Sequence, residues 1–143
     1  MCRGKTRNKK CTWRPAVIAI DGPAASGKST IGQAVGEALN YLFFDTGVMY
    51  RAVTVAALNE GLDVTDADAV GALAESVLID IAPPDATHTD GRLTTVLVND
   101  EDVTPHTRTK EVDRAVSPVS VHERVRTALT AQQRRIALDY GTG

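Results

Sequence analysis

The sequence is poor in cysteine and lacks long apolar runs. Its two cysteines, Cys2 and Cys11, are not spaced as a metal-binding Cys-x-x-Cys pair and have no further cysteine to join them. We therefore expect free thiols in a reducing compartment. No uninterrupted apolar run reaches membrane length, and residues 1–15 contain no apolar stretch of about seven residues such as a secretory signal needs. These absences predict a cytoplasmic protein with no membrane partner.

Basic residues are scarce beyond position 15. Residues 1–15 hold six of the 16 lysines and arginines and no acidic residue, whereas the rest of the chain holds ten basic against 18 acidic residues. Nucleic-acid binding depends on many Lys and Arg contacts to phosphates, so the acidic body argues against a nucleic-acid partner. We expect the basic tail to be a solvated, disordered arm. The 143-residue chain is long enough for one domain with one core.

A glycine-rich motif is the strongest signal in the sequence. It lies between residues 16–21, which are typical of a buried parallel strand, and an amphipathic helix that starts at Lys28. In such a loop, backbone N–H groups converge on phosphate oxygens at the positive end of the helix. The motif predicts a nucleoside triphosphate site, with Lys28 on the β and γ phosphates, Ser29 binding Mg²⁺ and Thr30 assisting at the helix start. The loop residues are Gly22, Pro23, Ala24, Ala25, Ser26, Gly27, Lys28 and Ser29.

Helical and extended patterns alternate after this loop. The helix from Lys28 should bury one apolar face, and a second short strand is expected at residues 41–45. Residues 48–60 predict a largely buried helix that ends at Gly61. The chain therefore starts as βαβα. The expected buried face of the first helix consists of Ile31, Ala34, Val35, Ala38 and Leu39.

A third helix, capped by Thr65, is expected to run to about Val77. After it the hydrophobic pattern changes from helical to extended. Residues 77–82 and 92–98 are rich in β-forming residues, and a short extended piece at 101–103 follows an Asn-Asp turn. These runs predict a small antiparallel insert.

The last part of the chain is predicted to be helical. A short helix is expected at residues 108–117, with Pro118 interrupting it. Ser120 and Glu123 then form a capping-box pattern for a longer helix through about Asp139.

A second motif, Asp45-Thr46-Gly47-Val48-Met49-Tyr50-Arg51, lies where the second predicted strand gives way to a helix. Thr46 and the helix N-terminus could bind polar or anionic groups, and Arg51 could fork onto a phosphate. From local sequence alone, a turn, a helix cap and one surface arginine explain the segment almost equally well. The three histidines, His88, His106 and His122, are expected at the surface with no catalytic role.

The residues from Gly22 to Thr30, together with Asp45-Thr46-Gly47-x-x-Tyr50-Arg51, closely resemble the bacterial cytidylate kinase family. Residues 100–117 also resemble that family's segment leading through an Arg-Thr-x-Glu-Val motif to an Ala-x-Ser stretch. The resemblance implies an α/β fold with a P-loop NTPase-type three-layer parallel sheet core, incomplete at the C-terminus, and a small antiparallel insert that binds the nucleoside monophosphate. On this basis residues 16–45 form the P-loop core, 46–117 the monophosphate-binding region and 118–140 a helix returning to the core.

The activity implied by the resemblance is transfer of the γ-phosphoryl group of ATP, with Mg²⁺, to CMP or dCMP by a monomeric enzyme. Thr46 would contact the cytosine nucleotide, and Ser117 would contribute to the base pocket. Arg51 and Arg108 would hold the acceptor's phosphate, which suits a permanently charged planar fork. With Lys28, these two arginines are the catalytic candidates, since phosphoryl transfer depends mainly on positioning and charge stabilisation.

In the resembled family, a further core strand, a Gly-Arg-Asp motif and a lid segment follow the position of residue 143. That strand lies between the two strands expected at 16–21 and 42–45, so we expect a marginally stable chain that represents an N-terminal part. Two alternatives stay open. One is a non-catalytic nucleotide-binding fragment, and the other is a P-loop GTPase or ATPase, which is less favoured because no Asp-x-x-Gly switch motif appears at a predicted strand end.

Overall fold

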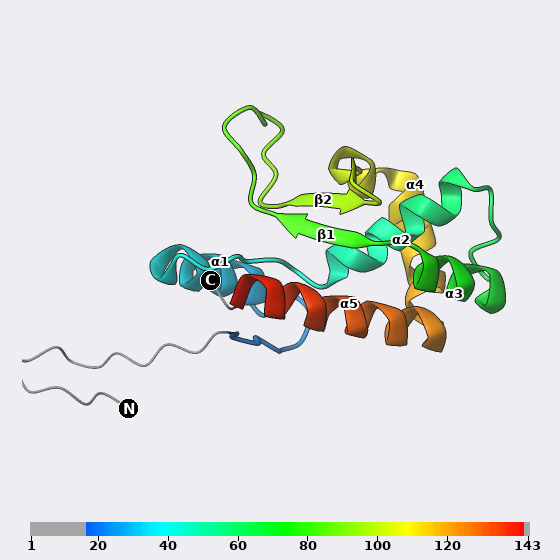
Figure 1. Ribbon diagram of the computed structural model, residues 1–143, viewed down its shortest axis with the longest axis horizontal. Coiled ribbons are helices and arrows are strands. Elements are labelled where there is room, and N and C mark those ends of the chain that lie inside the picture. The colour runs from blue at the N-terminus through cyan, green and yellow to red at the C-terminus, as the bar shows by residue number, and fades with distance from the viewer. Residues whose placement is uncertain (1–16, 142–143) are drawn as a thin grey trace, which may run out of the picture.

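The structure is a computed structural model that describes residues 17–141, so the expectations for the basic tail, Cys2 and Cys11 lie outside the described residues. Five α-helices, one 3₁₀ helix and three short strands make up this part (Figure 1). In chain order they are α1 (Lys28–Leu39), α2 (Gly47–Asn59), α3 (Ala67–Ser76), β1 (Ile79–Ala82), β2 (Thr95–Val98), β3 (Glu101–Asp102), η1 (Thr104–Arg108), α4 (Lys110–Ser120) and α5 (Glu123–Gly141).

The three strands form one antiparallel sheet in the order β1-β2-β3, which confirms the predicted insert. Ile79 pairs with Val98 in the β1–β2 register. Asn99 and Asp100 connect β2 to β3 with φ angles of 50° and 68°. Two successive positive φ values are typical of a type I′ turn, whose twist matches a tight hairpin. The loop between β1 and β2 is longer and extends beyond the sheet (Figure 1).

The hydrophobic core lies between this sheet and the helices α2 to α5. Met49, Ala52 and Val53 of α2 are fully buried and pack with Ile79 of β1 and Val96 of β2. Helix α5 packs along α3 and contacts β1. Because each element buries one apolar face in this common core, residues from Gly47 onward form a helix-covered antiparallel unit. None of the helices in the described segment is long and apolar enough to cross a membrane.

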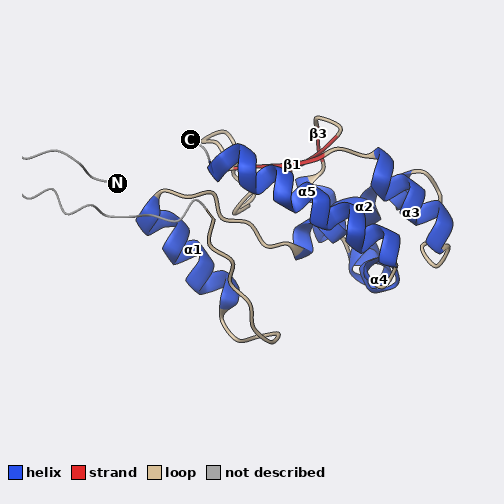
Figure 2. Ribbon diagram, turned by 60° about the horizontal axis from the view of Figure 1, so that its bottom comes forward, coloured by secondary structure: helices blue, strands red, loops and turns tan. Residues whose placement is uncertain are grey.

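Helix α1 lies apart from the other helices (Figure 2), and the predicted buried face is only partly confirmed, since Val35 and Leu39 are half-buried. Ile31 is 57% exposed, and Ala34 and Ala38 are also exposed. The helix packs instead through Gly32 and Gly36 against Phe43, so closely that a Cβ at Gly32 would lie 2.5 Å from the Phe43 ring. Two glycines one turn apart thus provide the contact that we expected from the apolar residues.

The two parallel strands predicted beside the P-loop are not formed among the described residues. Residues 17–21 and 41–45 have extended or irregular backbone with no strand pairing, and Val17, Ile18 and Ile20 are 53%, 40% and 41% exposed. A strand exists only where a neighbour completes its hydrogen bonds. No described segment lies between these two runs as a pairing strand, so the expected three-layer parallel core is absent from residues 17–141, while the α/β character is retained.

Several predicted helix ends are also wrong. Asp66, not Thr65, caps α3, because its carboxylate accepts hydrogen bonds from the amides of Asp68 and Ala69. Helix α4 continues through Pro118 to Ser120. Pro118 is close to the end of the helix, where the loss of one backbone hydrogen bond affects few following residues.

The predicted capping box at the start of α5 does not form. The Ser120 hydroxyl donates to the carbonyl of Ser117 within α4 instead of capping α5. Helix α5 begins at Glu123 and includes Gly141, which we expected beyond its end. Gly61, with φ of 66°, does follow the end of α2 as predicted. There it accommodates the left-handed conformation that commonly ends a helix.

Candidate functional site

The P-loop leads directly into the N-terminus of α1. Gly27 has φ of 89°, a conformation that favours glycine. The Lys28 ammonium lies 2.6 Å from the carbonyl oxygen of Gly22 and 3.1 Å from that of Pro23, donating to both. These bonds hold the lysine across the start of the loop. Thr30 follows in the first turn of α1 and is exposed, as are most of the loop residues between Pro23 and Gly27.

Ser29 and Asp45 connect the P-loop helix to the start of α2. The Ser29 hydroxyl donates to Oδ2 of Asp45 over 3.3 Å, and the amide of Gly47 donates to Oδ1 over 2.8 Å. Hydroxyl and carboxylate oxygens are the ligand types that Mg²⁺ prefers, with water and substrate phosphates completing its shell. The described residues contain no cluster of three or more His, Cys, Asp or Glu side chains suited to a metal. The chemistry of this pair fits the predicted Mg²⁺ role of Ser29.

A cavity of about 180 Å³ lies between the P-loop helix and the antiparallel insert. Ser29 and Arg108, two of the predicted site residues, both line it, although they are far apart along the chain. The lining includes both apolar side chains and three threonines. The lining residues are Ser29, Phe43, Asp45, Val48, Leu93, Thr94, Val96, Thr104, Thr107 and Arg108.

Arg51 lies beside this cavity without lining it. Its Nη1 atom donates to the carbonyl of Thr107 over 2.8 Å and forms an ion pair with Oδ1 of Asp113 over 2.6 Å. Thr107 lines the cavity, so the Arg51 guanidinium contacts a lining residue without lining the cavity itself. The Arg51 side chain is 35% exposed. It is therefore accessible to an anion that competes with Asp113.

Arg108 ends the 3₁₀ helix η1 and faces the cavity directly. Its Nη1 atom donates to the carbonyl oxygen of Asp90 over 3.2 Å. Thr46 precedes α2 and is exposed, with no side-chain cap bond. Ser117 is exposed on α4, and its carbonyl accepts from Ser120. The structure thus brings Arg108 to the cavity and leaves Thr46 and Ser117 outside its lining.

The sequence interpretation missed most of the cavity wall. Thr104 and Thr107 are only 3% and 2% exposed, and the Thr107 hydroxyl donates to the carbonyl of Thr104 over 2.7 Å. Two threonines in the Thr104-Pro105-His106-Thr107 segment at the start of η1 were a visible signal. Asp45, the first residue of the second motif, was another. Leu93 and Thr94 had no local signal, because they reach the cavity through the pairing of β2.

Arg92, which directly precedes Leu93, forms ion pairs with Asp90 and Asp102. Hydrogen bonds from the Arg92 side chain lower the pKa of Asp90 to about 2. At Asp102, burial would raise the pKa, but hydrogen bonds from Thr104 and Arg92 outweigh it and lower the pKa to about 2. Hydrogen bonds from Asp90 and Asp102 in turn raise the pKa of Arg92 above its ordinary value. All three side chains therefore stay charged at neutral pH.

Two of the histidines are less exposed than we expected. His88 is 25% exposed and lies 3.2 Å from Asp85 and 3.7 Å from Asp102. A ring nitrogen of His122 lies 2.8 Å from the carbonyl of Val64. His106 is exposed. None of the three lines the cavity beside the P-loop.

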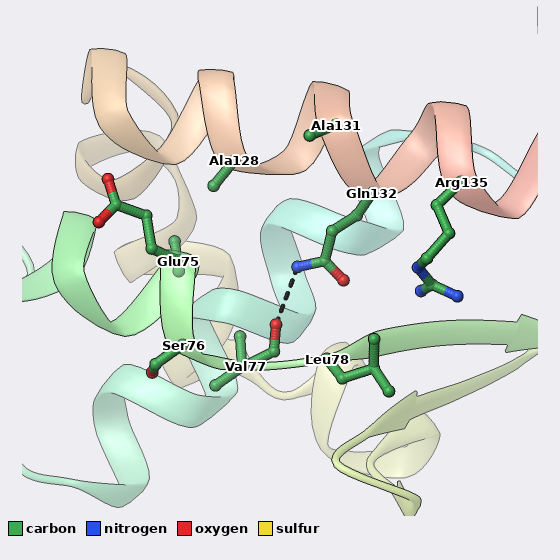
Figure 3. A pocket seen from close by; sticks show the side chains of 9 residues that line it. Glu75, Ser76, Val77, Leu78, Ala128, Ala131, Gln132 and Arg135 are labelled. Atoms are coloured by element: carbon green, nitrogen blue, oxygen red, sulfur yellow. Dashed lines mark hydrogen bonds between the residues drawn. The ribbon is translucent and has the colours of Figure 1, made fainter.

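A larger cavity, about 480 Å³, lies between α3, the start of β1 and α5, away from the P-loop. Figure 3 shows Gln132 reaching from α5 toward β1, where its amide nitrogen donates to the carbonyl of Val77 over 2.9 Å. Its Oε1 atom accepts from the amide of Ile79 over 2.7 Å. Gln132 thus bonds to the outer edge of β1 as a neighbouring strand would. The cavity contains none of the predicted site residues.

Comparison with known proteins agrees with the two motifs and the insert. The cytidylate kinase family model matches residues 18–142. The chain is 52% identical over 123 residues to a cytidylate kinase of Roseiflexus castenholzii, a match that covers 85% of this chain and 52% of the relative. A cytidylate kinase of Chloroflexus aggregans is 51% identical over 122 residues, with 85% and 52% covered.

A bifunctional pantoate ligase/cytidylate kinase of Gloeobacter violaceus is 45% identical over 123 residues, which cover 86% of this chain and 23% of the relative. The chain therefore spans about half the length of the single-function relatives, 52% for the first two. The matched region includes the P-loop, the motif around Asp45 and the antiparallel insert. This chain belongs to the cytidylate kinase family.

Proposed function

We propose that the chain carries the donor and acceptor sites of an ATP-dependent CMP or dCMP kinase. The observation that carries this proposal is the cavity lined both by Ser29 of the P-loop and by Arg108 of η1. A kinase must bring the γ phosphate of its donor next to the phosphate of its acceptor. A cavity that joins a P-loop to a cationic wall on a separate element meets this requirement.

The P-loop residues bind the triphosphate in this proposal. Backbone amides of the loop and of the N-terminus of α1 donate hydrogen bonds to the phosphate oxygens, and Lys28 exchanges its carbonyl partners for the β and γ phosphates. Ser29 and Asp45 would hold Mg²⁺, which when bound neutralises charge on the transferring group. The γ-phosphoryl group moves to a phosphate oxygen of the acceptor and leaves ADP. No side-chain nucleophile takes part.

The acceptor binds between the insert and α2. Arg108 lines the cavity and Arg51 lies beside it, and each presents a guanidinium suited to a dianionic phosphate. The apolar side chains of the lining, among them Phe43 and Leu93, would cover the faces of a planar base, and Thr94 offers a hydroxyl to its edge. Thr46 and Ser117 are assigned to the nucleotide on the sequence pattern alone.

The P-loop core with a parallel sheet is part of the same proposal. Residues 17–21 and 41–45 would become parallel strands when a strand pairs between them, and the exposed Val17, Ile18 and Ile20 would then be buried. A polypeptide of this family with about twice the length could supply that strand. We further propose a monomeric, cytoplasmic enzyme.

The half-length match favours one second candidate, a nucleotide-binding fragment without turnover. Isothermal titration with ATP and with CMP, followed by a coupled ADP-release assay, separates the two. The kinase proposal expects binding of both nucleotides and ADP release that requires CMP. Lys28→Met should weaken ATP on the order of a hundredfold and leave CMP binding intact, with Lys110→Met as the matched control. Failure of the wild-type chain to bind CMP would overturn the kinase proposal, and binding of both without turnover would support the fragment.

A further inference from the structure

Arg92 is a buried arginine beside the acceptor cavity that does not itself line it. Only 4% of its side chain is exposed, although it lies in the loop between β1 and β2. Burying a permanently charged group is costly unless ion pairs and hydrogen bonds compensate it. Here Nε and Nη2 donate to the two carboxylate oxygens of Asp90 over 2.9 and 2.7 Å. Nη1 donates to Oδ2 of Asp102 over 2.7 Å.

These three residues, Asp90, Arg92 and Asp102, form what we call the Arg92 clamp. Asp90 belongs to the loop, whereas Asp102 is the last residue of β3. The clamp therefore fixes the end of a long loop to the far strand of the sheet. The Arg92 fork is planar and matches a carboxylate with two parallel bonds, so it fixes direction as well as distance.

Each carboxylate-bearing residue of the clamp also holds a residue of the cavity wall. The backbone carbonyl of Asp90 accepts from Nη1 of Arg108 over 3.2 Å. Oδ1 of Asp102 accepts from the amide of Thr104 over 2.9 Å. Arg108 and Thr104 both line the cavity. One buried guanidinium is thus bonded to the two residues that hold a cation of the wall and the backbone of Thr104, whose hydroxyl accepts from the amide of Val96.

We propose that Arg92 is a positioning residue for the nucleoside monophosphate acceptor. It sets the orientation of the Arg108 guanidinium toward the acceptor phosphate and holds the backbone of Thr104 in the cavity wall. This inference rests on the proposed acceptor site. It assigns no role to Arg92 at the donor site, because the clamp has no contact with the P-loop among the described residues.

Arg92→Met tests the clamp, since it keeps a long apolar stem and removes the fork. Titration of the full chain with CMP should give about tenfold weaker binding, as expected for lost charged hydrogen bonds, and ATP affinity should stay unchanged. Arg92→Lys should give an intermediate loss, because a single ammonium cannot reproduce two forked pairs. Arg124→Met is the matched control. It breaks the ion pair between α5 and Glu75 of α3, neither of which lines the acceptor cavity, and it should leave CMP affinity unchanged.

The outcomes separate the clamp from the function on which it rests. CMP binding by the wild type with equal affinity in Arg92→Met overturns the clamp alone, whereas no CMP binding by the wild type overturns the acceptor site and the clamp together. Parallel weakening of ATP and CMP, together with a lower thermal midpoint, would mean a merely structural role. Should Arg92→Met not fold, Arg92→Lys and Asp90→Asn decide, and wild-type CMP affinity in both overturns the clamp.

Discussion

Arg51 and Asp113 form an ion pair of 2.6 Å although 62 residues separate them in the chain. Arg51 is one turn into α2, and Asp113 is in the first turn of α4. The pair joins two helices that pack against each other in the core. It also places a carboxylate on the guanidinium that we propose for the acceptor phosphate. Asp113 would therefore compete with an acceptor phosphate at Arg51.

Asp113→Asn should strengthen CMP binding. The substitution removes the competing charge and leaves Arg51 bonded to the carbonyl of Thr107. Because Arg51 is 35% and Asp113 53% exposed, the pair should be worth about 0.2–1 kcal/mol, and the CMP dissociation constant should fall up to about fivefold. Isothermal titration measures this change.

Glu111→Gln is the control for this prediction, since Glu111 lies in the same first turn of α4 and the substitution removes the same charge. Its CMP affinity should equal that of the wild type. An equal gain in both variants would mean that general charge reduction, not release of Arg51, strengthens binding.

Gln132→Leu should destabilise the fold. The leucine cannot bond to Val77 and Ile79, and Ile79 is fully buried, so its amide would lose its partner away from water. An unsatisfied buried group costs about 1–3 kcal/mol. Urea unfolding followed by circular dichroism should give a lower free energy of unfolding by about this amount. Gln133→Leu, one position along α5, should change it much less, and equal losses would contradict the role of Gln132 at the strand edge.

Local sequence was sufficient for the hairpin but not for the parallel strands. The Asn99-Asp100 turn and the β-rich runs on either side specify an antiparallel pair within a few residues. The run at 17–21 is equally apolar, yet its strand conformation depends on a neighbour from elsewhere in the chain. The hydrophobic pattern of a segment indicates which residues prefer burial, but it does not identify the strand that must pair with it.

The candidate site divides in the same way. The P-loop was indicated by a contiguous motif, because the chemistry of phosphate binding is encoded in adjacent residues. Arg108 was indicated only by the family resemblance, and the structure places it in the cavity lining. The clamp around Arg92 could not be predicted, since Asp102 reaches the guanidinium that Asp90 holds only after β2 and β3 pair. The Arg51–Asp113 pair likewise follows from helix packing.

Helix α3 allows a direct test of one wrong prediction. Asp66 accepts from two backbone amides, whereas the Thr65 hydroxyl donates to Asp63 and caps nothing. Asp66→Ala should therefore lower the free energy of unfolding by about 1 kcal/mol, within a usual range of about 0.5–2. Thr65→Ala should cost less. Urea unfolding of the two variants under the same conditions compares them, and a larger loss for Thr65→Ala would restore Thr65 as the cap.

Acid should unfold the protein partly through the clamp. Hydrogen bonds from Arg92 to Asp90, and from Thr104 and Arg92 to Asp102, lower both pKa values from an ordinary 3.8 to about 2. A carboxyl group whose pKa is lower in the folded state stabilises the fold above its unfolded pKa. That contribution is lost as the pH falls from about 4 toward about 2. Urea midpoints of the wild type should therefore drop between about pH 5 and about pH 3.

Asp102→Asn should lower the midpoint at about pH 5, where the lost charge still matters, and should show a smaller further drop at about pH 3. Glu101→Gln changes the neighbouring residue of β3, which is exposed and outside the clamp, and should keep the wild-type dependence. The comparison isolates the proton uptake of one carboxyl group, since both variants remove one negative charge from the same strand. If the Asp102→Asn midpoint fell between the two pH values as steeply as that of the wild type, the acid sensitivity would arise from other carboxyl groups, and the clamp would carry no pH-dependent stability.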